Sequence, residues 1–140
     1  SSVCCAQPRD MAEIQKMMAK MQKSHIEGNV PDEADFGVYM QRDLRAYFSS
    51  YGDNITLKYQ LLRDGPTQSG ISYPKYYVWV QVIEGTEIIQ EGAARVAALE
   101  KTRFEVFDFL SKSDLQKSPD TAAQVFPAAL LAKINQLAGV

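Results

Sequence analysis

Apolar side chains in the first third of the chain recur every three or four residues, a period that predicts two amphipathic helices. The first helix starts at Asp10, where Asp10 and Glu13 make a capping-box-like pair, and it ends at Gly28. Its apolar positions are Met11, Ile14, Met17, Met18, Met21 and Ile26. The second helix starts at Pro31 and stops at Gly52, with an apolar stripe formed by Phe36, Met40, Leu44, Tyr47, Phe48 and Tyr51.

The methionines of the first helix allow two interpretations. Flexible methionine side chains can build adaptable binding surfaces, but they fill gaps in hydrophobic cores more often. We therefore expect this face to belong to the core, with a recognition surface as the alternative.

The pattern then changes to a period of two, which predicts four antiparallel strands. In the first strand, Ile55, Leu57, Tyr59 and Leu61 alternate with polar residues. The loop RDGPTQSG leads to the strongest strand, YYVWVQVIEG, and Gly85-Thr86 suits a tight turn. The stretch QEGAARVAALEKTRFEVFDFL, residues 90–110, supplies two more strands that meet near Glu100-Lys101. Its alanines would let helices approach closely, and the space beside them would be filled by Phe104, Phe107 and Phe109.

Helical signals return in the last third of the chain. Ser111 with Asp114 marks one helix start, Ser118 before Pro119 marks another, and Pro127 interrupts the second of these helices. The face directed at the body of the domain consists of Leu130, Leu131, Ile134 and Leu137. The fold class is α+β in a single domain over residues 10–140: N-terminal helices, a four-stranded antiparallel sheet and a C-terminal helix.

Both faces of the strongest strand are apolar, so both must be covered. We expect the pair of N-terminal helices to cover one face. The C-terminal helix or a second subunit would cover the other.

The strand pattern of KYYVWVQVIEGTEIIQEGAARVAALEKTRFEVFDFLS resembles the NTF2-like superfamily, over about residues 31–111. The resemblance implies N-terminal helices packed in the concavity of a curved sheet, a cone-shaped pocket, and dimerisation through the outer sheet face in some members. A cystatin-like arrangement, with one helix wrapped by four strands, fits the core nearly as well. The chain departs from the family by its helical segment after the sheet and by having Ile55–Arg63 and a loop where members place a strand and a short helix.

Composition narrows the function classes. The net charge of −2 leaves no basic surplus for nucleic acid or an anionic membrane surface. No apolar run approaches the length of a membrane helix. The chain has no cysteine or histidine cluster at zinc spacing, and it lacks both GxxxxGK[ST] and GxGxxG, so no metal or nucleotide cofactor is predicted.

The first residues, SSVCCAQPRD, resemble the tail of a secretory signal whose apolar region lies upstream. Residues 1–9 are then a signal-peptide remnant or a disordered segment, and the mature chain begins near Gln7. Export to the periplasm or the extracellular space is expected on this interpretation. A cytoplasmic location is the alternative.

Asp108 and Arg95 are the residues most able to carry chemistry. A carboxylate in apolar surroundings can serve as a general base, and Asp108 follows the parity of Phe104, Val106 and Leu110. Arg95 follows the parity of Ala93, Ala97 and Leu99. If the two share a face, a structural ion pair is the expected outcome, with an anion clamp as the alternative.

Aromatic and polar strand residues supply the candidate ligand-binding set: Tyr59, Tyr77, Trp79, Gln81 and Arg95. Tyrosine and tryptophan anchor binding sites, although strands also favour them for packing. The single histidine, His25, is expected to be a helix-end residue because no second histidine accompanies it.

These observations favour a non-enzymatic module that binds a protein partner or a small apolar ligand, with a homodimer as one expected state. The second hypothesis is a small isomerase or dehydratase that uses Asp108 and a tyrosine. The third is an acidic bacterial secretion chaperone, which would be cytosolic and dimeric.

Overall fold

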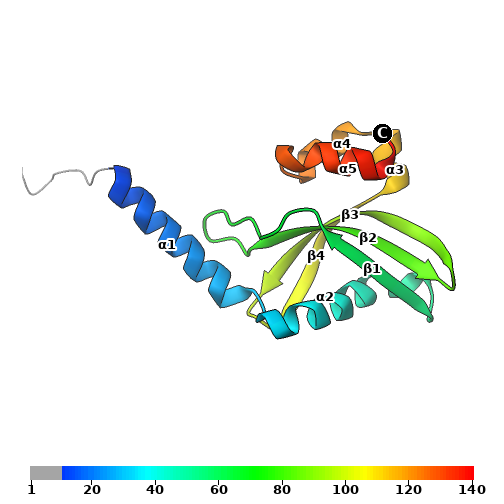
Figure 1. Cartoon of the computed structure of the whole chain (residues 1–140), viewed down its shortest axis with the longest axis horizontal. Coiled ribbons are helices and arrows are strands. Elements are labelled where there is room, and N and C mark those ends of the chain that lie inside the picture. Colours follow the sequence, from blue (N-terminus) through cyan, green and yellow to red (C-terminus); the bar gives the residue numbers. More distant parts are fainter. Residues whose placement is uncertain (1–10) are drawn as a thin grey trace, which may run out of the picture.

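The computed structural model describes residues 11–140, in which helices flank a four-stranded sheet (Figure 1). The N-terminal part contains α1 (Met11–Asn29), α2 (Glu33–Tyr47) and the short helix η2 (Ser49–Tyr51). The strands are β1 (Ile55–Leu61), β2 (Lys75–Glu84), β3 (Glu87–Leu99) and β4 (Arg103–Ser111). The C-terminal part contains α3 (Lys112–Lys117), α4 (Asp120–Val125), η3 (Ala128–Leu130) and α5 (Leu131–Ala138).

The sheet is an antiparallel meander in the order β1-β2-β3-β4. It is not closed, and it carries helices before and after it in the chain. The predicted α+β class is therefore confirmed, with the strands close to their expected places. The predicted remnant at residues 1–9 and the cap at Asp10 lie outside the described residues.

α2 covers one face of the sheet, because its apolar stripe fits the alternate side chains of the strands. Met40, Leu44 and Phe48 are fully buried there. Their partners in this core, drawn from all four strands, include Leu57, Val78, Val80, Val96 and Phe104. This packing also explains the small residues of β3, since Ala94 and Ala98 lie in the same core.

The C-terminal helices cover the opposite face, as Figure 1 shows above the sheet. The second core joins the strand residues Tyr77, Trp79 and Ala93 to residues of the C-terminal helical segment, which include Leu115, Ala122, Phe126, Ile134 and Ala138. Of the two covers expected for this face, the C-terminal helices therefore provide it. The described chain is a three-layer arrangement of helix, sheet and helices.

A β-bulge in β4 decides which face Asp108 occupies. Arg95 pairs with Asp108, but its neighbour Val96 pairs with Val106, so Phe107 is the extra residue. The predicted parity of Asp108 is wrong in part: it shares a face with Leu110 but not with Val106, because the bulge reverses the alternation. Phe107 was expected to fill space in the core, but 44% of it is exposed, so it is not a core residue.

The expectation that the methionine face of α1 belongs to the core is wrong. α1 has no buried residue and extends away from the sheet (Figure 1). The physical reason is that both sheet faces are already covered, one by α2 and the other by the C-terminal helices. The apolar side chains buried on both faces of the sheet pack against those helices and not against α1.

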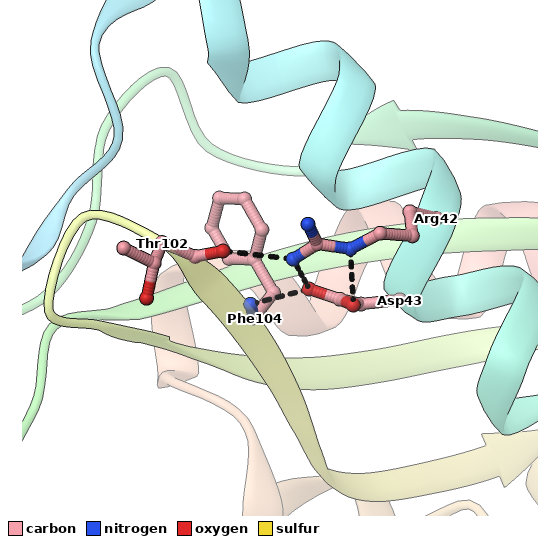
Figure 2. A network of polar contacts seen from close by, with 4 residues as sticks. All are labelled: Arg42, Asp43, Thr102 and Phe104. Atoms are coloured by element: carbon pink, nitrogen blue, oxygen red, sulfur yellow. Dashed lines mark hydrogen bonds and ion pairs between the residues drawn. The ribbon is translucent and has the colours of Figure 1, made fainter.

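A polar network joins α2 to the end of the β3–β4 hairpin (Figure 2). The Asp43 carboxylate accepts a hydrogen bond of 2.7 Å from the backbone N–H of Phe104. Arg42 donates two hydrogen bonds to that carboxylate and one, of 2.8 Å, to the carbonyl of Thr102. These bonds set the position of α2 along the sheet.

Candidate functional site

Arg95 and Asp108 face each other across the β3–β4 pair on the side of the C-terminal helices. Arg95 Nη2 lies 2.5 Å from Asp108 Oδ2, and about a third of each side chain is exposed (33% and 31%). Arg95 Nε is buried and has no hydrogen-bond partner within the described chain. The predicted ion pair is therefore present.

This pairing bears on whether Asp108 can act as a general base. A base of that kind needs apolar surroundings and a free lone pair directed at a substrate. Asp108 instead has a guanidinium beside it and partial access to water. The geometry matches a structural ion pair on the sheet surface.

Lys75 adds a second cation to this region. It lies near Arg95, and its pKa is lowered from the ordinary value, first by burial and then by the charge of Arg95. Its ammonium also lies 5.1 Å from the centre of the Phe107 ring. A cation over a ring face is attracted by the ring quadrupole, so the bulged Phe107 contacts a charge and not the core.

A hollow of about 300 Å³ opens on the same face of the sheet, beside α5. Its lining consists of Lys58, Tyr59, Gln60, Trp79, Gln81, Glu91 and Leu137. Three of the five predicted ligand-binding residues, Tyr59, Trp79 and Gln81, are thus brought together. Glu91 is also paired with Lys112, at 3.5 Å.

The other two predicted residues lie elsewhere. Arg95 is engaged by Asp108. The Tyr77 hydroxyl is 2.8 Å from the Thr67 hydroxyl, and its ring meets Phe126 edge to face. Both contacts belong to packing, so Tyr77 holds the β1–β2 loop and α4 against the sheet.

Tyr59 belongs to two surfaces. Besides its place in the hollow, it packs against the core beneath α2. Burial raises the pKa of its phenol above the ordinary value, and burial does the same for the pKa of Tyr76. Both phenols are therefore neutral at physiological pH.

A row of exposed apolar side chains runs along α1, and we call it the α1 stripe. It consists of five residues that are between 37% and 66% exposed: Met11, Ile14, Met17, Met18 and Met21. Soluble proteins rarely leave such contiguous apolar surface in water unless it binds something. The alternative interpretation of the methionines, a recognition surface, is the one that fits the structure.

Ile71 extends this surface and was not singled out by the sequence. It lies at the tip of the β1–β2 loop and is 90% exposed. With Gly70 it borders an apolar hollow of about 140 Å³ whose other walls are Met18, Met21 and Gln22. The sequence signal that could have identified Ile71 is a large apolar residue in a loop rich in glycine, proline and serine.

Two features are absent from residues 11–140. Within this range no three histidine, cysteine, aspartate or glutamate side chains gather as metal ligands would. None of its helices combines the length and the apolar character needed to cross a membrane.

Comparisons with protein-family models, with curated proteins and with solved structures found no match to this chain. The NTF2-like and cystatin-like resemblances therefore stay predictions. Function has to be argued from the geometry alone.

Proposed function

We propose that this protein is a non-enzymatic module that binds another protein chain through α1. The observation that carries the proposal is the α1 stripe, which lies on a helix with no buried residue. The rest of the domain closes its own two cores without any help from this helix. The apolar side chains of α1 therefore lie outside both cores.

The energetics of a projecting helix support this proposal. Most helical stability in proteins comes from packing of an apolar face against other structure. Within the described residues, α1 spans 19 residues and buries none of them. A partner that covers the stripe would supply that packing.

The test is position-specific photo-crosslinking in the cells that express the chain. A photoreactive residue at Met18 lies within the stripe, whereas one at Ala19 points to another side of the helix. We expect protein adducts from position 18 and few from position 19. Equal yields, or no adduct with any protein, would contradict the proposal.

The hollow beside α5 supports a second candidate function, the binding of a small polar molecule. Lys58, Gln81 and Glu91 line this hollow together with Trp79. Sites of this kind combine an apolar wall with a few oriented polar groups. Trp79 is the single tryptophan of the chain, so its fluorescence reports this site directly.

A screen of small polar metabolites by tryptophan fluorescence tests the second candidate. A genuine ligand should shift the emission in a saturable way, and Gln81→Ala should remove the shift while leaving the fold intact. A library without any saturable response would argue against this candidate. Neither candidate requires export or an NTF2-like ancestry.

A further inference from the structure

We infer that the α1 stripe binds the α1 helix of a second copy of this chain, forming a homodimer. This inference rests on the proposed function and names its partner. The spacing of the stripe, the charges beside it and the position of α1 in the fold all support this partner.

The spacing of the stripe is that of a two-helix seam. Met11, Ile14, Met18 and Met21 follow one another at steps of three, four and three residues. The same steps continue to His25 and Gly28 within α1. Apolar residues at these alternating steps form the contact line between two packed helices. A helix that docks into a domain groove usually carries a wider apolar face.

The residues that flank this seam are uncharged. Gln15 and Gln22 lie on one side of it, and Met17 and Ser24 lie on the other. Charges at these flanking positions ordinarily select or reject a partner helix. Without them, a second identical helix brings no like charges together in either orientation, so self-pairing meets no electrostatic barrier.

All the charged residues of α1 lie on the remaining positions: Glu13, Lys16, Lys20, Lys23 and Glu27. Lys23 and Glu27 form an ion pair of 3.8 Å on that side, with both side chains largely exposed. An acidic or basic partner would be expected to find residues of opposite charge at the edges of the seam, where α1 has uncharged residues. The distribution of charge thus favours an identical helix over a charged protein.

The position of α1 leaves the seam accessible. α1 projects beyond the sheet, on the side where the β1–β2 loop lies (Figure 1). Its 19 residues span about 28 Å, enough for about two and a half repeats of the seven-residue pattern. So short a seam predicts a reversible dimer, with Ile71 adding apolar surface beside Met18 and Met21.

Sedimentation equilibrium over a range of concentrations is the first test. Wild-type protein should shift from monomer to dimer as its concentration rises. Met18→Glu/Met21→Glu should raise the dissociation constant at least about tenfold, since it places charge in the seam. The matched control is Ala12→Glu/Ala19→Glu, which adds the same charge away from the seam and should leave the constant unchanged.

Disulfide cross-linking locates the contact independently. In a Cys4→Ser/Cys5→Ser background, which removes both native thiols, Met18→Cys should form a dimer under mild oxidation. Ala19→Cys, one residue away, should remain largely monomeric. Circular dichroism of each variant checks that the sheet is retained.

Three outcomes would overturn the inference. One is a wild-type protein that stays monomeric at every concentration, and another is a dimer that Met18→Glu/Met21→Glu leaves intact. The third is monomeric protein that floats with lipid vesicles through the stripe. If the protein is monomeric but Met18 photo-crosslinks to a different protein, the homodimer fails while the proposed function stands.

Discussion

Gly92 of β3 lies opposite Ser111 of β4, with the β4 backbone close to its Cα. A Cβ atom at this position would stand 2.2 Å from the carbonyl oxygen of Leu110 and 2.7 Å from the Cα of Ser111. Both atoms belong to the backbone, so neither can move aside cheaply. We predict that Gly92→Ala lowers the free energy of unfolding by about 2 kcal/mol or more. Urea denaturation measures the change.

Gly28→Ala is the matched control for that substitution. Gly28 lies in α1 with nothing within 4 Å of an added Cβ, and alanine favours helix more than glycine does. It should leave the urea midpoint of the sheet unchanged. A Gly92→Ala protein as stable as wild type would show that the strands can separate locally.

Tyr76 makes stability depend on alkaline pH. Burial raises the pKa of its phenol, so the folded state holds the proton at pH values where the unfolded chain releases it. The stabilisation is complete below pH 10.0, the ordinary pKa, and is lost as the pH rises through the folded value. Tyr76→Phe should make the decline in unfolding free energy above pH 10.0 shallower. Chemical denaturation at several pH values tests this.

Tyr59 and Lys75 complete the comparison. Burial also raises the pKa of Tyr59, so Tyr59→Phe should act in the same direction. The lowered pKa of Lys75 has the opposite sign, because the folded state loses that proton first and gains stability as the pH rises toward 10.5. Identical pH profiles for wild type and Tyr76→Phe would contradict the prediction.

For single residues, the alternation of side chains along each strand predicted some contacts and missed others. Arg95 and Asp108 were expected to pair if they shared a face, and they do. They share it because Phe107 is an extra residue in β4, which no local pattern revealed. A bulge depends on how two strands fit together, so a single strand does not predict it.

Among the elements, the β3–β4 turn is under conformational strain. Glu100 and Lys101 both have positive φ, of 53° and 64°, which costs a residue with a side chain about 1 kcal/mol or more. Contacts with the end of α1 hold the turn: the Asn29 side chain accepts from Glu100 N–H, and its carbonyl accepts from Lys101 N–H. Both bonds use the backbone of the turn.

We predict that Lys101→Gly raises the free energy of unfolding by about 1 kcal/mol, because glycine adopts positive φ without strain. The substitution removes only an exposed ion pair with Asp32, which contributes little. Thermal and urea denaturation measure the gain. Lys117→Gly, at the end of α3, is a control that should not stabilise.

Element positions were predicted well by the periodicity of the chain. Helices and strands appeared near their expected bounds, since amphipathic spacing is a local property. Which segment covers each face of the sheet could not be predicted from local spacing. The stripe on α1 has the same spacing whether it meets a core or a partner, so its role depended on how much of the sheet α2 had already covered.

For the whole molecule, we predict two classes of backbone protection in hydrogen exchange. Amides of β2 and β3, buried between two cores, should exchange only by global opening. Amides of α1 should exchange far faster in dilute protein, because no residue of that helix is buried among the described residues. Raising the protein concentration should slow exchange in α1 alone. Uniformly slow exchange in α1 of dilute protein would contradict both the prediction and the proposed role of the helix.

The sequence by itself determined the α+β class and the order of the elements, and it indicated Arg95 and Asp108 as candidates for an ion pair. These follow from periodicity and turn chemistry, which act over a few residues. Only the tertiary structure decided that the C-terminal helices cover the second face of the sheet, that a bulge turns Asp108 toward Arg95, and that α1 remains uncovered. Coverage is a competition among all the apolar surfaces of a chain. Its outcome depends on how these surfaces fit together in the folded chain, and no segment carries that information alone.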